Sequence, residues 1–220
     1  LDLQDFFPSI ARARVTGLFR AIGYPENVAV ALAGLVTNLP DVAVFRNHAD
    51  ARPTYHRPHL PQGAPTSAAL ANACAWRLDC RLQGLARAAN VAYGRYADDL
   101  AFSGDASFRR GLDSFAARAA AIVMEEGFAV NYRKTRVMPA GVRQRLAGLV
   151  TNEHPNVPRE EFDRLKATLT NCLRHGPQTQ NRENHPAWRE HLEGRVGFCE
   201  MVNPAKATRL RKLLAAIHWQ

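Results

Sequence analysis

Residues 91–102 read VAYGRYADDLAF, in which two adjacent carboxylates, Asp98 and Asp99, interrupt apolar, strand-forming residues. Alternating strand formers on both sides of a short polar break predict a β-hairpin with the two acids at its tip. Neighbouring side chains on a strand point to opposite faces, but at a tip the backbone turns and both can lean toward one point. Two like charges this close repel by about 1 kcal/mol in water and by several times that in a partly dry cleft. The arrangement favours a bound cation, and a divalent metal ion is the simplest candidate.

An aspartate pair is also ordinary turn chemistry, and a third acid favours the metal interpretation over it. Asp2 lies in LDLQDFF (residues 1–7), an apolar, strand-like stretch in which a charge is costly. Together Asp2, Asp98 and Asp99 offer hard oxygen ligands without histidine or thiolate, which suits Mg²⁺ rather than zinc. A pair of Mg²⁺ ions about 3.5–4 Å apart can activate a 3′-hydroxyl and stabilise a departing pyrophosphate.

Length and composition bound the remaining possibilities. The 220 residues suffice for one large domain or two small ones, and no apolar run reaches the roughly 18 residues of a membrane span. The chain starts with Leu1 in a strand-like stretch, which predicts a fragment trimmed upstream rather than a signal peptide. The four cysteines lack CxxC spacing and are expected to be buried thiols of a reducing compartment, so the expected location is the cytoplasm. His56 and His59 lack a matching second pair, which disfavours zinc.

The net charge of +9 is unevenly distributed. Residues 1–132 carry 13 Lys and Arg against 12 Asp and Glu, whereas residues 133–220 carry 16 against 8. Most of the excess is arginine, which suits bidentate phosphate contacts. A basic C-terminal third beside an acid-centred first part suggests a polyanion held next to a metal site, although basic surfaces are often only solvated.

Hydrophobic periodicity predicts an α+β portion up to about residue 152 and an all-helical portion after it. In the first portion we expect a helix from Pro8 to Gly23, and one from Glu26 to Asn38 with Val28, Ala31, Leu32 and Leu35 on one face. A short strand at Val42–Phe45 and a loop over residues 46–61 follow, and then a long helix capped by Thr66 or Ser67. After the hairpin we expect a helix over Phe108–Glu126, a strand pair within 128–138 and a strand at Leu146–Val150. Three helices are expected after Pro158, the last beginning at Asn203-Pro204.

Four blocks in this order resemble bacterial reverse transcriptases, especially the retron type: LDLQDFFPSI (1–10), LPQGAPTSAALAN (60–72), YGRYADDLAFSG (93–104) and GFAVNYRKT (127–135). The similarity continues through Arg143-Gln144 and residues 149–152 to residues 192–196, and so covers essentially the whole chain. It implies a right-hand polymerase palm, an antiparallel sheet with helices on one face, over residues 1–152. Partial fingers elements would lie around 24–60, and residues 153–220 would form a helical thumb whose arginines follow a template–primer backbone.

The resemblance also implies roles for residues near the acids. Asp2 and Asp98 would bridge two Mg²⁺ ions with Asp99 beside them, and Leu3 would offer its backbone carbonyl to one ion. Backbone amides near Asp5 and Phe6 would meet the nucleotide triphosphate. Phe7 would act as a steric gate that excludes a 2′-hydroxyl, although without the motif it reads as a core residue.

Further roles follow for residues outside the opening strand. Gln62 would contact the nucleotide sugar and Gly63 would let the backbone come close, in what is also a helix-entry turn. Lys134 would protonate or stabilise the leaving pyrophosphate, or else is a solvated surface lysine. The primer grip would be the hairpin built from Arg143, Gln144, Leu146, Ala147 and Gly148.

The implied function is RNA-directed DNA synthesis from dNTPs on an RNA template with a DNA or RNA primer, without membrane association. A structured non-coding RNA and a defence effector protein are further partners that the resemblance leaves open. The family's fingers region precedes the first aspartate, so we expect this fragment alone to be poorly active. Retron enzymes often carry Val-Thr-Gly where this chain has Leu146-Ala147-Gly148, so an intron-like or a phage-defence reverse transcriptase stays open as well. Two functions of different classes also stay open: a nucleotidyl cyclase with a similar sheet, and a non-catalytic RNA-binding scaffold.

Overall fold

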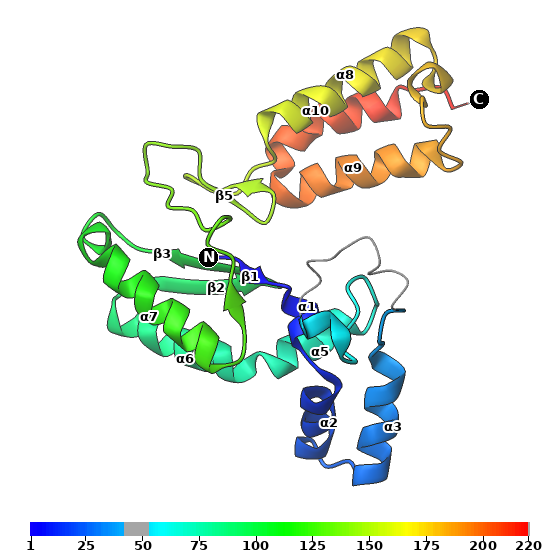
Figure 1. Ribbon diagram of the computed structural model, residues 1–220. Helices are drawn as coiled ribbons and strands as arrows, with labels where there is room; N and C mark the ends of the chain where they lie inside the picture. Colours follow the sequence, from blue (N-terminus) through cyan, green and yellow to red (C-terminus); the bar gives the residue numbers. More distant parts are fainter. Residues whose placement is uncertain (42–52, 220) are drawn as a thin grey trace. The chain divides into compact units, whose positions relative to one another are not determined.

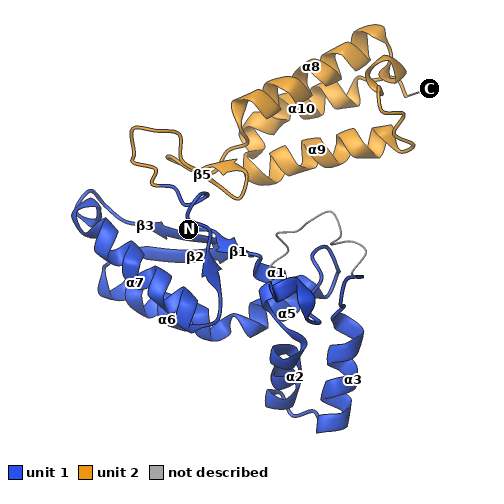
Figure 2. Ribbon diagram, viewed as in Figure 1, with its two compact units in different colours: residues 1–136 blue, residues 137–220 orange. Residues whose placement is uncertain are grey.

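The computed structural model describes residues 1–41 and 53–219, which fold as two compact units, Leu1–Arg136 and Val137–Gln220 (Figure 2). The expected strand at Val42–Phe45 lies outside the described residues. The sequence placed a boundary near residue 152, whereas the second unit begins at Val137 and includes a β-hairpin before its helices. With this division the first unit carries 16 basic and 12 acidic residues and the second 13 and 8. The second unit is therefore the more basic one per residue, but by less than the division at residue 132 suggested.

A small antiparallel sheet forms the centre of the first unit (Figure 1). Strands β2 (Ala92–Tyr96) and β3 (Asp99–Ser103) form the predicted hairpin, with Tyr96 opposite Asp99 and only Ala97 and Asp98 in the turn. Strand β1 (Leu3–Gln4) pairs with β4 (Ala129–Val130), and a bridge between Asp2 and Asp99 joins the two pairs. The strand order is therefore β4, β1, β3, β2. Residues 128–138 were expected to pair with each other, but β4 pairs with β1 instead.

Two helices, α6 (Trp76–Ala88) and α7 (Leu112–Glu125), cover one face of this sheet (Figure 1). The short 3₁₀ helix η2 (Phe108–Gly111) leads into α7, which ends before Gly127, whose φ of 82° suits a residue without a side chain. The core between helices and sheet consists of fully or almost fully buried apolar side chains, among them Leu3, Phe6, Leu78, Leu82, Leu100, Phe115 and Val123. Burial of these side chains on one face of the sheet holds β1 and β3 side by side.

Two expected helices are interrupted. The first divides into α1 (Phe6–Ser9) and α2 (Arg12–Ala21), because the backbone of residues 10–12 pairs with residues 58–60 instead of continuing the helix: Arg12 N donates to Pro58 O and Leu60 N donates to Ile10 O. The long helix divides at Ala75 into α5 (Ser67–Cys74) and α6. The expected cap is also wrong, because Thr66 makes no capping hydrogen bond and the Ser67 hydroxyl donates to Pro61 O at 2.6 Å.

Helix α3 (Glu26–Val36) forms at its predicted place but buries a different face. Ala29, Ala33 and the following Thr37 are buried, whereas Leu35 is 83% exposed. The small alanines let α3 approach α2 closely, whereas the larger Val28, Val30 and Leu35 lie on the exposed side. The 3₁₀ helix η1 (Pro53–His56) follows the undescribed segment.

The second unit contains a hairpin and three helices. Strands β5 (Arg145–Leu146) and β6 (Leu149–Val150) replace the single strand expected there, with Ala147 and Gly148 at positive φ in the turn. Helices α8 (Arg159–His175), α9 (Trp188–Val202) and α10 (Pro204–Ala215) follow as expected, with the 3₁₀ helix η3 (Pro177–Gln180) between the first two. Asn203 caps α10 through Lys206 N at 3.0 Å. Their core includes Leu165, Leu169, Leu192, Val196 and Leu210.

The four cysteines are free thiols. Cys74, Cys172 and Cys199 are buried as expected, and burial raises the pKa of each of these thiols. Cys80 is exposed, contrary to expectation. Within the described residues, none of the helices combines the length and apolar character needed to cross a bilayer.

Candidate active site

Asp2 and the Asp98–Asp99 pair lie next to each other although Asp98 and Asp99 are 96 and 97 positions from Asp2 in the sequence. Asp2 forms an antiparallel bridge with Asp99, Leu3 N donates to Asp98 O at 2.8 Å, and Leu100 N donates to Leu1 O at 2.8 Å. These backbone bonds fix β1 against the start of β3. The three acids predicted from the sequence therefore share one end of the sheet.

The electrostatics of this end are those of crowded carboxylates. Partial burial raises the pKa of Asp99, and the neighbouring charges of Asp98 and Asp2 raise it further. Asp2 is buried, and the Lys134 ammonium lies 3.7 Å from its Oδ2 while remaining 65% exposed. A cation placed among the acids would relieve this repulsion.

The donor set fits a hard divalent cation, because it consists of carboxylates with a backbone carbonyl nearby. Among residues 1–41 and 53–219, however, no three acidic, histidine or cysteine side chains are close enough to form a ready-made metal site. The acids are adjacent in the backbone, but their side chains do not converge on one point. A substrate's phosphates would have to supply the remaining oxygen ligands.

The chain turns sharply where it leaves β1. Asp5 adopts a left-handed conformation with φ 47°, and its Oδ1 accepts a hydrogen bond from the Tyr55 hydroxyl at 3.1 Å. Phe6 is buried against Phe128, and Phe7 lies half-buried with its ring edge-on to Phe6 at 5.3 Å. The first amides of a helix lack partners within it, so at the start of α1 Phe6 and Phe7 present backbone donors, whereas Pro8 has no N–H.

Gln62 and Gly63 occupy the turn before α5, and both are exposed. Gly63 has φ 91°, which an L-residue rarely adopts, and a Cβ added there would have open space around it. The positive φ explains why a glycine occupies position 63, and the open space around it leaves its backbone accessible.

The hairpin of the second unit contains the expected primer-grip residues. Arg143 forms an ion pair with Glu160 at 2.9 Å, and the Gln144 side-chain amide donates to Met138 O at 2.9 Å. Leu146 is partly exposed, and Ala147 and Gly148 form the turn. A hairpin was expected over Arg143–Gly148 and is formed by residues 145–150, whereas the gripping role remains a prediction.

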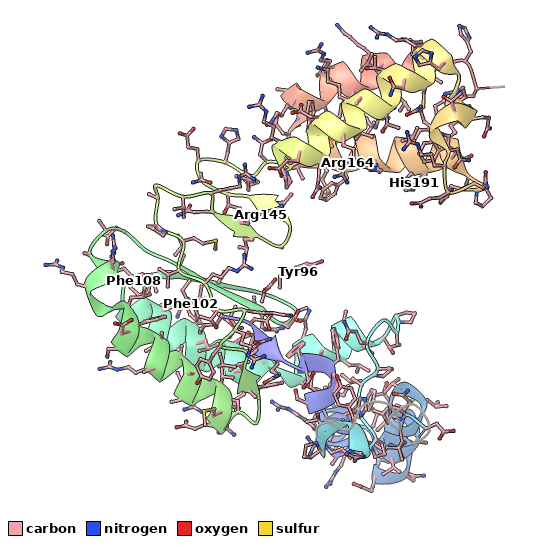
Figure 3. The ribbon with its side chains drawn as sticks, turned by 45° about the horizontal axis from the view of Figure 1, so that its top comes forward. Tyr96, Phe102, Phe108, Arg145, Arg164 and His191 are labelled. Carbon is pink, nitrogen blue, oxygen red and sulfur yellow. The ribbon has the colours of Figure 1, made fainter. Side chains whose placement is uncertain are left out.

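A polar cluster around the buried Arg95 side chain was not predicted from the sequence. The Arg95 side chain, only 6% exposed, contacts Asp79 through Nε at 2.8 Å and Nη2 at 2.6 Å. Its Nη1 donates to Ala97 O at 3.1 Å, inside the turn that carries Asp98. The sequence signal that could have indicated this cluster is an arginine in an otherwise apolar strand. At the end of the same strand Tyr96 is 69% exposed and projects from the sheet (Figure 3).

Comparisons with known proteins agree with these observations. A family model described as reverse transcriptase (RNA-dependent DNA polymerase) matches residues 1–169. Similar curated proteins include the retron Mx65 and retron Mx162 reverse transcriptases of Myxococcus xanthus, which are 44% identical over 216 residues and 38% identical over 224 residues. The retron Ec86 reverse transcriptase of Escherichia coli is 31% identical over 170 residues.

These alignments cover 96%, 94% and 77% of this chain but 48%, 44% and 47% of the three relatives. The chain thus spans about half the length of the curated relatives it matches. The resemblance indicated by the four sequence blocks is confirmed.

Proposed function

Because the chain belongs to the reverse transcriptase (RNA-dependent DNA polymerase) family, we propose that the protein containing it adds dNTPs to a primer 3′-hydroxyl on an RNA template. The observation that carries the proposal is the backbone bridge between Asp2 and Asp99, one residue from Asp98. Carboxylates from two adjacent strands beside an exposed lysine are a suitable arrangement for nucleotidyl transfer, in which the protein mainly positions charge.

We assign Asp2, Asp98 and Asp99, with the Leu3 carbonyl, to the binding of two Mg²⁺ ions. The crowded carboxylates and the raised pKa of Asp99 support a bound cation. When bound, such ions lower the pKa of the primer hydroxyl and offset charge on the pyrophosphate. Lys134, whose ammonium lies near Asp2, would donate a proton or a hydrogen bond to the pyrophosphate.

The incoming nucleotide would lie between the β1–α1 turn and the Gln62–Gly63 turn. Backbone amides near Asp5 and Phe6 would bind the triphosphate, and Phe7 would lie under the sugar, where its ring leaves no room for a 2′-hydroxyl. Gln62 would contact that sugar, and the positive φ of Gly63 permits a close backbone approach.

We propose that the first unit is the palm and that the helices of the second unit form the thumb. The Arg143–Gly148 hairpin, which clusters with those helices, would hold the primer end. The basic second unit would follow the nucleic-acid backbone by salt-sensitive phosphate contacts.

We place the protein in the retron type, with a structured non-coding RNA as template and partner. The three curated relatives support this placement, and the highest of their identities extends over nearly the whole chain. The Leu146-Ala147-Gly148 turn departs from the Val-Thr-Gly that retron enzymes often carry there. An association with a defence effector protein stays a prediction.

The test is primer extension on an RNA template with Mg²⁺ and dNTPs, using the protein at its natural length. We expect cDNA from the wild-type protein and a loss of about 10³-fold or more with Asp98→Asn. Asp113→Asn, at an exposed position on α7, is the matched control and should stay within about twofold. Phe7→Ala should allow ribonucleotides to be incorporated. Absence of cDNA, or an unchanged rate with Asp98→Asn, would refute the proposal.

A further inference from the structure

We propose that the Arg95–Asp79 pair is a positioning device that fixes the Ala97–Asp98 turn and so holds the backbone of Asp98 and Asp99 beside Asp2. This inference rests on the proposed function. It assigns a role to two residues that lie outside the predicted site and that do not reach the reacting atoms themselves.

One guanidinium connects four elements around the turn. It makes a two-point contact with Asp79 on α6, donates through Nη1 to Asn72 Oδ1 on α5 at 3.0 Å, and donates to Ala97 O at 3.1 Å. Its face lies over the Phe6 ring of α1, with 5.5 Å between Cζ and the ring centroid. The Arg95 side chain therefore links the turn to three helices of the first unit.

The burial of the Arg95 side chain distinguishes a structural role from a role in phosphate binding. In a protein expected to bind nucleic acid, an arginine would first be interpreted as a phosphate ligand. The Arg95 side chain is 6% exposed, and four of its five N–H donors are directed at Asp79, Asn72 and Ala97, which leaves little of it for a phosphate. The contribution of Arg95 is therefore structural support of the turn rather than contact with the nucleic acid.

The turn needs such support because its backbone is strained. Ala97 has φ 50°, a left-handed conformation that costs a non-glycine residue free energy. A charge-assisted hydrogen bond from Arg95 to the Ala97 carbonyl favours this conformation. On the next residue, Asp98 O accepts from Leu3 N of β1 at 2.8 Å. The carbonyls of two consecutive residues, Ala97 and Asp98, are thus held from two sides, which fixes the backbone that carries the Asp98 side chain.

Asp79 completes the device by orienting the guanidinium. Its Oδ1 also accepts a hydrogen bond from the Tyr93 hydroxyl at 2.7 Å, so the carboxylate is fixed by two residues of β2. A lysine at position 95 would keep the charge opposite Asp79. A single ammonium cannot, however, reproduce the two-point contact with Asp79 and also reach both Asn72 and Ala97.

The experiment compares Arg95→Lys and Asp79→Asn with wild type in the protein at its natural length. We expect kcat for single-nucleotide incorporation to fall about 10- to 100-fold, the range for loss of one charge-assisted hydrogen bond. The Kd for the primer–template should stay within about twofold, because the Arg95 and Asp79 side chains are engaged within the first unit. Amide hydrogen exchange over residues 91–103 should accelerate, and this readout does not depend on catalysis.

Arg81→Lys is the matched control. Arg81 also joins α6 to another element through acids, but these are Glu125 at the end of α7 and Glu126 just after it, away from the turn. We expect Arg81→Lys to lower the melting temperature while leaving kcat and exchange over residues 91–103 unchanged.

Equal losses of kcat in Arg95→Lys and Arg81→Lys would overturn the inference, because they would show that kcat falls with any loss of stability in the first unit. Unchanged hairpin exchange in Arg95→Lys would overturn it as well. If the wild-type protein makes no cDNA, the proposed function fails, and the exchange comparison still decides whether Arg95 holds the turn.

Discussion

Gly104 follows β3 at the end of the hairpin opposite the acids, and replacing it with alanine should destabilise the first unit. An added Cβ would lie 2.7 Å from Val91 Cγ1 and 2.9 Å from Phe108 Cβ, well inside ordinary van der Waals contact. Gly104 does not have a positive φ, so the cost is steric rather than conformational. Overpacking of this kind costs about 1–3 kcal/mol.

The neighbours of Gly104 have little room to move. Val91 is buried, and the Phe108 ring packs edge-on against Phe115 at 5.0 Å, which in turn packs against Phe102 at 4.9 Å. Figure 3 labels Phe102 and Phe108 at this end of the unit. Displacing the Phe108 Cβ would shift this aromatic cluster, so we place the expected cost in the upper half of the range.

Urea denaturation followed by circular dichroism measures the change, with Gly94→Ala as the matched control. Gly94 lies within β2, and a Cβ added there would have nothing within 4 Å. An alanine inside a strand is expected to be neutral or to stabilise by up to about 1 kcal/mol. The reasoning is refuted if Gly104→Ala is as stable as wild type, or if Gly94→Ala loses as much stability.

Three further predictions concern stability. Leu169→Ala, at a fully buried position on α8, should lower the free energy of unfolding by about 2–5 kcal/mol. Leu173→Ala, at a 42% exposed position one turn later, should lower it by less than about 1 kcal/mol. Urea denaturation followed by the fluorescence of Trp188 and Trp219 measures both changes. Asn203→Ala removes the cap of α10 and should cost about 1 kcal/mol in the same assay, and an unchanged urea midpoint would contradict this. Burial, followed by the hydrogen bond to Asp79, raises the pKa of Tyr93 above its ordinary value of 10.0, so the native state keeps a proton that the unfolded chain releases. Stability should therefore fall as the pH rises above 10, and Tyr93→Phe should lose less over that range; equal losses would contradict the assignment.

The β2–β3 hairpin of the first unit and the three helices of the second unit could be predicted from the sequence because their signals are local. Alternation on both sides of Ala97-Asp98 defines β2 and β3, and apolar residues at helical spacing define α8, α9 and α10. The cap at Asn203 and the stop at Gly127 also depend only on neighbouring residues.

Other features depend on partners distant in sequence. Helix α3 is apolar on more than one side, so periodicity could not decide between the face of Leu35 and the face of Ala33. The break between α1 and α2 depends on residues 58–60, and β4 pairs with β1 rather than with the residues that follow it. Such pairings are set by packing of the whole unit, which local patterns do not contain.

The candidate site likewise contains residues that the sequence predicted and residues that it did not. The acids were predicted because a charge in an apolar strand is costly and therefore conspicuous. Arg95 met the same criterion, but nothing near it in the sequence indicated Asp79 on α6 as its partner. Only the packing of α6 against β2 brings the two together.

The proposed function depends most on Asp2 and Asp98 acting as one unit, and a double-mutant cycle measures this directly. Primer-extension rates would be compared for wild type, Asp2→Asn, Asp98→Asn and the double variant, with folding checked by circular dichroism. Residues that act together are strongly non-additive, so we predict that the double variant is about as slow as either single variant. A shared site would be contradicted if the loss of rate in the double variant were the product of the two single losses, or if Asp2→Asn synthesised cDNA at the normal rate.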